Sequence, residues 1–353
     1  MDKKLIHAVA GSGKTTSIIG KLNLEKRALV ITYTDNNMSI LKKAIIDKFG
    51  FIPENIKVYT YFTFLYNFAL KPQENEIDYY SNWKKSKGID FRTRSSDVDK
   101  FLSSRSNRFY INGNLEYYSF RMSRLILNKN SMFLYLKSRV NKYFDFMFID
   151  EVQDFASYDF DFVLKFSEVG IPVEAYGDFY QHTFDTSNDG NKNVNLYSQY
   201  NDYKKRFNGL YVFDDTTLSK SYRCSRNLCQ YVQNNLGIIM SSHRDDDIEI
   251  REITDDTEIS AMINDSSVVK LFYKENYKYS VKTSDNWGNS KGSTYDNVCV
   301  VLNKTTYSNF KRNKLKELNS QTLRKLYVAI TRAKSAVYFV EEQRIRNLGF
   351  MIP

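Results

Sequence analysis

The sequence predicts an α/β protein with parallel sheets, because short apolar segments alternate with helical stretches along its 353 residues. Residues 5–10 and 28–32 are two such segments, and the stretch between them suits a crossover helix joining parallel strands. Later apolar segments predict further buried strands at 144–149, 173–176, 298–302 and 336–340. The hydrophobic content of 42% is sufficient for two packed cores. Two lobes, each built on a parallel sheet, fit this order best.

Positive charge is in excess and is concentrated in one stretch. Lysine and arginine outnumber acidic residues 51 to 41, so we expect a polyanionic partner. Residues 84–142 contain 14 basic residues against 4 acidic ones. Aromatic residues are interleaved with these charges, namely Phe91, Phe109, Tyr110, Tyr117, Tyr118 and Phe120. The composition is that of a nucleic-acid groove, and equally that of a solvated helical insertion whose rings form a small core.

Cysteine use and hydropathy indicate a cytoplasmic protein. Cys224, Cys229 and Cys299 have neither the paired spacing of a zinc site nor the density of a disulfide framework, so we expect reduced thiols. The chain has no apolar run of about 18 residues. It also starts without an apolar leader segment. We therefore expect a soluble protein with no membrane partner.

A glycine-rich segment follows the first predicted strand and precedes the first predicted helix. Its spacing from Ala8 to Lys14 is that of a phosphate-binding loop, with alanine in place of the first glycine. The glycines let successive amides point at phosphate oxygens, Lys14 neutralises the β and γ phosphates, and the Thr15 hydroxyl ligates magnesium. We predict that ATP and Mg²⁺ bind here, at Ala10, Gly11, Ser12, Gly13, Lys14, Thr15 and Thr16.

Two carboxylates end a later apolar strand, at Asp150 and Glu151. Asp150 is placed to hold the magnesium ion through water, and Glu151 to orient and deprotonate the attacking water. Together with the glycine-rich loop, the pair predicts one site for ATP hydrolysis.

The segment from Asp150 to Asp154 reads Asp-Glu-Val-Gln-Asp and resembles the second motif of superfamily 1 helicases of the UvrD, Rep and PcrA type. Other motifs of that family follow in the family's order. The resemblance implies two RecA-like lobes, residues 1–215 and 216–353, with a small, mainly helical basic insertion at about 66–142. The lobes are shorter than those of the larger relatives, so the chain looks like a compact motor core.

The resemblance also implies catalytic residues outside the loop and the carboxylate pair. Gln181 lies in a Gly-Asp-x-x-Gln motif that senses the γ-phosphate. Arg223, in Ser-Tyr-Arg, is similar to the arginine that reaches the γ-phosphate, and Arg332 resembles the arginine finger of the last motif. Residues 290–296 stand where the fifth motif belongs and include Gly292, expected near the nucleotide, and Lys291.

Single-stranded DNA is the partner that the family resemblance implies. The segments similar to the family's DNA-contacting motifs are 32–34 and 60–64. The expected DNA-contacting residues are Thr32, Tyr33, Thr34, Thr60, Tyr61, Phe62, Phe184, Trp287 and Lys291.

These features predict an ATP-dependent single-stranded DNA translocase or helicase, with 3′ to 5′ movement implied by the resemblance. Two alternatives stay open. The first is an ATP-gated sensor or regulatory subunit of a nuclease complex, such as one in antiphage defence, that binds DNA without unwinding it. The second is an RNA helicase, because related enzymes act on RNA.

Overall fold

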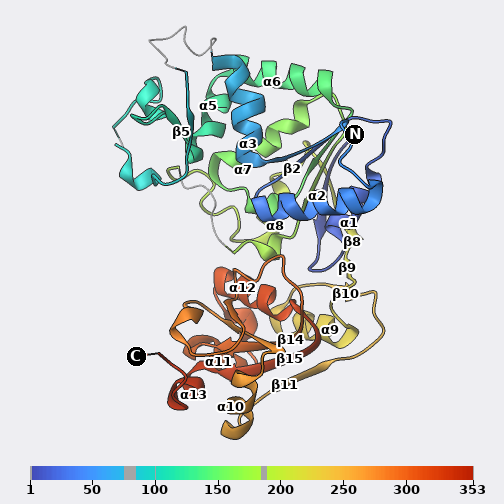
Figure 1. Ribbon diagram of the computed structural model, residues 1–353, viewed down its shortest axis with the longest axis vertical. Helices are drawn as coiled ribbons and strands as arrows, with labels where there is room; N and C mark the ends of the chain where they lie inside the picture. The colour runs from blue at the N-terminus through green and yellow to red at the C-terminus, as the bar shows by residue number, and fades with distance from the viewer. Residues whose placement is uncertain (1, 75–84, 100, 184–188, 353) are drawn as a thin grey trace. The chain divides into compact units, whose positions relative to one another are not determined.

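The computed structural model describes residues 2–74, 85–99, 101–183 and 189–352. The chain divides into two compact units, coloured mainly blue to green and yellow to red in Figure 1. The first unit comprises Met1–Ile6, Lys14–Gly177 and Asp185–Asp214, and the second comprises His7–Gly13, Asp178–Phe184 and Asp215–Pro353. A short segment near the N-terminus and another in the middle of the chain therefore group with the later part of the sequence.

A six-stranded sheet is associated with the first part of the chain, in the order β3-β2-β6-β7-β1-β8. β2 pairs in parallel with β3 and β6, and β6 with β7. All five residues of β2 are buried, as expected for a parallel strand covered on both faces. The strands are β1 (Lys3–Ala8), β2 (Ala28–Thr32), β3 (Ile56–Thr60), β6 (Phe146–Ile149), β7 (Val173–Gly177) and β8 (Val212–Leu218).

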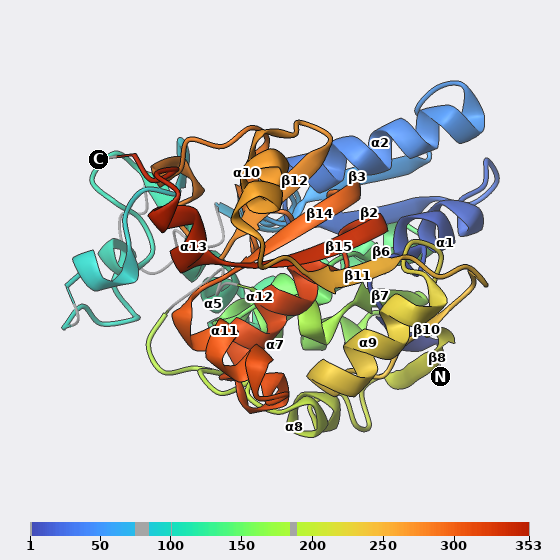
Figure 2. The same cartoon turned by 90° about the horizontal axis from the view of Figure 1, so that it is seen from below.

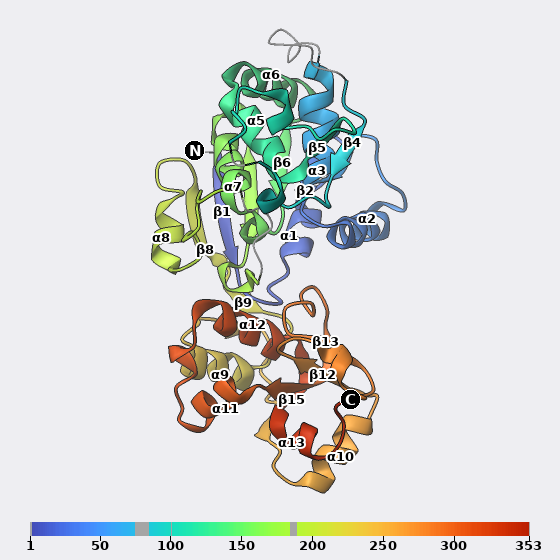
Figure 3. The same cartoon turned by 90° about the vertical axis from the view of Figure 1, so that its left-hand side faces the viewer.

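Helices follow the strands of this sheet, as Figures 1 and 3 show. α2 is capped at both ends, because Thr34 accepts the amide of Asn37 and the left-handed Gly50 donates to Ile46. The α-helices are α1 (Lys14–Lys21), α2 (Asp35–Phe49), α3 (Tyr61–Thr63), α5 (Met122–Asn128), α6 (Asn130–Tyr143), α7 (Ser157–Lys165) and α8 (Tyr200–Lys205). Shorter helical turns include η1 (Phe64–Leu70), η2 (Lys71–Gln73), η6 (Ser119–Arg121), η7 (Val152–Asp154), η8 (Phe166–Glu168) and η9 (Phe179–Gln181).

The second unit contains a five-stranded sheet in the order β11-β15-β14-β12-β13, with every neighbouring pair parallel. Its strands are β11 (Glu249–Glu252), β12 (Val268–Phe272), β13 (Ser284–Asn286), β14 (Tyr295–Leu302) and β15 (Ala333–Glu341). A short parallel pair, β9 (Lys220–Ser221) and β10 (Ser241–Ser242), accompanies it.

Two apolar cores cover the two faces of the second sheet. Along β14, Val298 and Val300 pack into one core while Cys299 and Val301 pack into the other, the alternation of a strand buried on both faces. The first core contains α9 and α12, and the second contains α10 and α13 (Figure 2). The helices are α9 (Arg226–Leu236), α10 (Asp256–Asn264), α11 (Lys304–Lys311), α12 (Ser320–Ile330) and α13 (Glu342–Asn347), with turns η10 (Asn276–Lys278) and η11 (Leu315–Glu317).

The predicted α/β class with parallel sheets is confirmed, and each of the six predicted strands is present. The strand at 28–32 has the predicted bounds, and the other five have shifted ends. At residues 5–10 the whole strand is displaced, because β1 ends at Ala8 and the next two residues enter the glycine-rich turn. The short strands β4 (Gly88–Asp90) and β5 (Glu116–Tyr118) form a parallel pair in the basic insertion. They were not predicted, because three residues are too few to show a period of two.

Most aromatic residues of the basic segment form a small core. Phe109, Tyr110, Tyr117 and Phe120 are buried, whereas Phe91 is 61% exposed. The guanidinium of buried Arg121 lies 3.6 Å from the centre of the Phe109 ring and donates to the Phe109 carbonyl at 2.6 Å. This burial favours the small-core interpretation for these four rings and leaves Phe91 available for contact.

No helix within the described ranges is both long and apolar enough to cross a membrane.

A buried carboxyl group connects three elements of the first unit. The Asp159 Oδ1 atom, in α7, accepts hydrogen bonds from the Tyr61 hydroxyl at 3.0 Å and the Ser123 hydroxyl at 2.6 Å. The Asp159 Oδ2 atom has no hydrogen-bond partner among the described residues. Burial raises the pKa of Asp159 to about 7, although both hydroxyl donors oppose this rise.

We expect Asp159→Asn to stabilise the protein above pH 7. The folded-state pKa of Asp159 lies above its unfolded-state value. The contribution of Asp159 to the free energy of unfolding is therefore largest below about pH 4, where the carboxyl group is protonated, and it is lost as the pH rises towards 7. At pH 8 the ionised Asp159 carboxylate lowers the free energy of unfolding by up to about 4 kcal/mol, and the substitution by asparagine removes this loss. Denaturant unfolding of both proteins at pH 4.5 and pH 8 measures it. A gain that is equal at both pH values would contradict the assignment.

Candidate nucleotide-binding site and strand-contacting segments

The glycine-rich loop turns sharply between β1 and α1. Gly11 and Gly13 have φ values of 72° and 86°, in the left-handed region that favours glycine. A Cβ atom on Gly11 would lie 2.6 Å from the Arg223 Cβ and 2.8 Å from the Ser221 Oγ, so this backbone also needs glycine for close packing. The Ser12 side chain is buried, and its Oγ has no hydrogen-bond partner in the part of the chain that the structure describes.

Lys14 and the predicted carboxylate pair meet in the first unit. The Lys14 Nζ atom lies 3.2 Å from the Glu151 Oε2 atom, and both side chains are 13% exposed. Glu151 has a left-handed backbone with φ 55°, and its amide donates to the Asp150 Oδ1 atom at 2.9 Å. The Gln153 amide also donates to Glu151. The sequence-predicted lysine and carboxylates are therefore brought together by the strands β1 and β6.

A chain of hydrogen bonds in the second unit starts at the glycine-rich loop. The Ala10 amide donates to the Tyr327 hydroxyl at 3.0 Å, and that hydroxyl donates to the Asp178 Oδ2 atom at 3.1 Å. The Gln181 side-chain amide donates to the same Asp178 oxygen at 2.8 Å. All of these groups are buried, so each bond satisfies a polar group that has left water.

The chain continues through the two predicted arginines and returns to the loop. Arg332 Nη2 donates to the Gln181 Oε1 atom at 3.4 Å, and Arg223 Nη1 donates to the Thr331 carbonyl at 3.2 Å. The Ser221 hydroxyl accepts the Arg223 amide at 3.2 Å and donates to the Ala10 carbonyl at 2.7 Å. We call this closed network the loop–arginine ring.

Arg332 carries a buried cation. It is 1% exposed, and its guanidinium donates to the carbonyls of Val328 at 2.9 Å and Ser293 at 3.3 Å. Burial, followed by repulsion from Arg223, lowers the pKa of Arg332 to about 10, so the group stays charged at neutral pH. Among the described residues neither arginine forms an ion pair, although the Asp178 carboxylate opposes the lowering of the Arg332 pKa. Arg332 is buried and Arg223 is half-buried, and two cations in such surroundings favour an anion nearby.

The donor set for magnesium is small and made of oxygen. Thr15, in the first turn of α1, and Asp150, at the end of β6, carry the hydroxyl and carboxylate expected for the ion. Within the described ranges, no group of three histidine, cysteine or acidic residues could hold a metal. Two protein oxygens fit Mg²⁺, which is usually bound through one or two side chains together with phosphates and water.

Four predicted DNA-contacting residues need correction because they are buried. Trp287 is 0% exposed and its Nε1 donates to the Leu271 carbonyl at 2.8 Å, so its ring belongs to the core. Tyr61 is 1% exposed and is held by Asp159. Thr32 lies in β2 at 0% exposure, and Thr60 is buried as the N-cap of α3. Their side chains do not offer a surface to a strand.

Three other aromatic residues form a row that reaches the surface of the first unit. Tyr33 contacts Phe62 with ring centres 5.5 Å apart, and Phe62 contacts Phe91 at 5.1 Å. Phe91 extends from a turn organised by Asp90, whose carboxylate accepts the Arg92 and Thr93 amides at 2.8 and 3.1 Å. The predicted residues Tyr33 and Phe62 thus connect to an exposed ring that sequence reasoning did not select as a contact.

The remaining predicted residues have mixed positions. Thr34 caps α2, and Thr16 is exposed on α1. Lys291 is partly exposed, and Gly292 is exposed with φ 85°. Phe184 lies outside the described residues.

Among the ring members that sequence reasoning did not select are Tyr327 and Asp178. Both stand inside motifs that were noticed, those of Arg332 and Gln181. Their polar side chains in apolar surroundings were the available signal, because a buried hydroxyl or carboxylate must find partners.

The parallel-sheet fold, the glycine-rich loop and the carboxylate pair are the features expected of a helicase core domain. The family model of the viral superfamily 1 RNA helicase core domain matches residues 95–341, and the chain therefore belongs to this family. No curated protein matches the sequence. The family assignment agrees with the superfamily 1 helicase class that the sequence motifs imply.

A solved helicase shares the fold, and a second one is less similar. An arterivirus nonstructural protein 10 helicase in complex with DNA is 14% identical, with a TM-score of 0.50 over 99% of this chain and 63% of that chain. The PRRSV helicase is 13% identical, with a TM-score of 0.47 over 99% of this chain and 54% of that chain. The chain thus spans less than two thirds of either helicase.

Proposed function

We propose that the protein is an ATP-driven motor that moves along single-stranded nucleic acid. The observation that carries the proposal is the loop–arginine ring, because it ties the glycine-rich loop to Gln181, Arg223 and Arg332. The two RecA-like lobes of this motor are residues 1–215 and 216–353 in the proposal. A motor needs such a connection, since a change at the nucleotide must alter contacts elsewhere in the chain.

The phosphates are proposed to bind at Lys14 and the glycine-rich loop, with Thr15 and Asp150 holding Mg²⁺. When bound, the Mg²⁺ ion would neutralise part of the negative charge of the phosphates. The unpartnered Ser12 hydroxyl is a further donor for a phosphate oxygen. The ion pair between Lys14 and Glu151 is expected to exchange for contacts with phosphate, which releases Glu151 to orient water.

Arg223 and Arg332 are proposed to stabilise the charge that develops on the γ-phosphate. Arg332 is buried and Arg223 is half-buried, and neither forms an ion pair among the described residues, which supports this because an anion would compensate both cations. Gln181, which accepts from Arg332, is proposed to report the state of the γ-phosphate to the rest of the ring.

The strand is proposed to be DNA, and RNA is the competing substrate. The likeness to UvrD, Rep and PcrA implies that the motor moves along the strand from 3′ to 5′. The viral family is named for RNA helicases, and the similar arterivirus structure contains DNA. The exposed Phe91 beside Arg92 supports contact with a strand, since rings stack on bases and cations meet phosphates.

We expect single strands to stimulate ATP hydrolysis, and Phe91→Ala to raise the strand concentration needed for half-maximal stimulation. Loss of one stacking contact of about 1–3 kcal/mol raises that concentration roughly fivefold to a hundredfold. Steady-state phosphate release is measured against concentrations of DNA and RNA oligonucleotides. The matched control is Phe101→Ala, because Phe101 is 96% exposed in the same segment.

The outcomes separate the alternatives. Stimulation by DNA alone supports the DNA motor, and stimulation by RNA alone supports the RNA helicase. A rate of ATP hydrolysis that neither DNA nor RNA changes would contradict the motor and favour the sensor. Equal effects of Phe91→Ala and Phe101→Ala would remove Phe91 from the strand path.

A further inference from the structure

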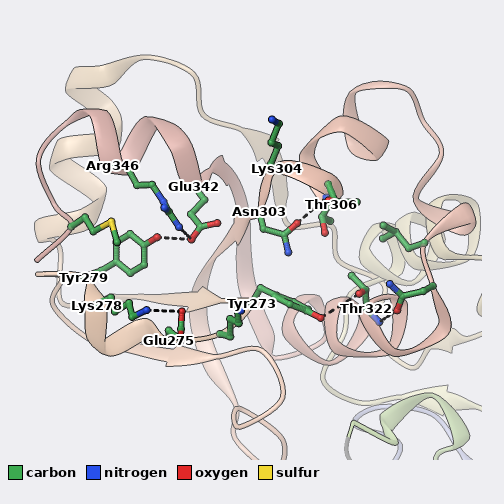
Figure 4. Close-up of a pocket in the computed structure, with 15 residues that line it drawn as sticks. Tyr273, Glu275, Lys278, Tyr279, Asn303, Lys304, Thr306, Thr322, Glu342 and Arg346 are labelled. Atoms are coloured by element: carbon green, nitrogen blue, oxygen red, sulfur yellow. Dashed lines mark hydrogen bonds and ion pairs between the residues drawn. The ribbon is translucent and has the colours of Figure 1, made fainter. Parts of the chain in front are cut away.

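A pocket of about 580 Å³ lies within the second unit, at the carboxyl ends of β12 and β14. Tyr273 follows β12 directly and Asn303 follows β14 directly, and both line the pocket (Figure 4). The volume is in the range that accommodates small ligands such as a nucleotide. None of the residues predicted from the sequence to bind ATP or DNA lines it.

Two helices begin at this pocket. Asn303 caps α11 by accepting the Thr306 amide at 3.0 Å, and Asn319 caps α12 by accepting the Thr322 amide at 2.9 Å. All four residues line the pocket. The first amides of a helix have no acceptor within the helix and lie at its positive end, so two such ends favour an anion.

Thr306 supplies an independent sign of a ligand. Its side chain is 0% exposed and lines the pocket, and its Oγ1 has no hydrogen-bond partner among the described residues. A buried hydroxyl without a partner costs stability. A ligand oxygen that accepts from Thr306 would remove this penalty.

The charges around the pocket are mainly positive. Lys278 pairs with Glu275 at 3.0 Å and Arg346 with Glu342 at 2.8 Å. Lys304 is exposed and forms no ion pair in the described part of the chain; Figure 4 shows its amine apart from the neighbouring carboxylates. The half-buried Tyr273 ring forms one wall, and its hydroxyl lies 3.5 Å from the Thr322 Oγ1 atom.

We infer that this pocket binds the phosphate of a nucleotide unit, with Thr306, Lys304 and the start of α11 around the phosphate and Tyr273 beside the sugar or base. The unit belongs either to a nucleic-acid strand or to a free nucleotide. If the unit belongs to a nucleic-acid strand, the inference rests on the proposed function, and the pocket is a second region that contacts the strand.

Two substitutions test the pocket. Thr306→Val keeps the shape of the side chain and removes only the hydroxyl, so the melting temperature should stay the same or rise while phosphate binding falls about tenfold. Lys304→Ala should weaken strand binding about threefold and reduce its salt dependence by about one counterion. Lys311→Ala is the matched control, because Lys311 lies on the same helix and pairs with Glu252 at 2.8 Å.

Binding is measured with two probes, a fluorescent single-stranded oligonucleotide of 12 thymidines or uridines and a free nucleoside monophosphate. The monophosphate is titrated into Lys14→Ala protein, in which the glycine-rich loop contributes little. Weaker oligonucleotide binding in the pocket variants supports the strand, and weaker monophosphate binding supports the free nucleotide. Unchanged binding of both probes would overturn the inference. Failure of the motor proposal is separate, since it would show as wild-type hydrolysis that no strand stimulates.

Discussion

Lys14→Ala is expected to reduce ATP turnover at least about a hundredfold, because removing one charge-stabilising group from a reaction site costs on this scale. Lys14 lies at the start of α1, 3.2 Å from Glu151, where its charge can exchange from carboxylate to phosphate. Phosphate release at saturating ATP and strand measures the loss.

Lys21→Ala is the matched control for this change. Lys21 ends the same helix and pairs with Glu174, a carboxylate outside the predicted site. Its loss should leave turnover within about twofold, since an exposed ion pair contributes at most about 1 kcal/mol. Retained turnover in the Lys14 variant would remove the glycine-rich loop from the site.

Arg332→Gln is expected to lower kcat about a thousandfold while ATP binding changes only a few-fold. The guanidinium is buried and charged, so it would act on charge that develops during hydrolysis. Glutamine keeps part of the polar contact with Gln181 and removes the cation. Single-turnover hydrolysis and equilibrium binding of a fluorescent nucleotide separate the two effects.

The control for Arg332→Gln is Arg312→Gln, which changes an exposed arginine at the end of α11. Melting temperatures test whether either protein is unfolded. Because glutamine is easier to bury than a cation, the Arg332 variant should remain folded. A rate within threefold of wild type in folded protein would show that Arg332 does not act on the γ-phosphate.

The sequence alone determined the local features. The glycines at 11 and 13 indicate a sharp turn, because glycine adopts positive φ values without steric strain, and the lysine that follows indicates phosphate as the ligand. The apolar run that ends at Asp150 shows both the strand and the carboxylate at its end. These features need only neighbouring residues, so a single chain displays them.

Tertiary packing decided which side chains face solvent. Tyr61 and Trp287 were predicted to contact DNA and Phe91 was not selected, yet Tyr61 and Trp287 are buried and Phe91 is exposed. Burial depends on residues distant in the chain, such as Asp159 against Tyr61, and aromatic composition does not reveal it.

The loop–arginine ring and the pocket at the carboxyl ends of β12 and β14 likewise exist only in the folded chain. The Ala10 amide donates to the Tyr327 hydroxyl although the two residues are 317 positions apart in the sequence. Thr306 lies in a pocket whose lining comes from segments that are separate in the sequence. Sequence therefore determined which chemical groups are present and on which local elements. Tertiary structure decided which of them meet, because hydrogen bonds and burial are set by contacts between segments that the order of residues does not bring together.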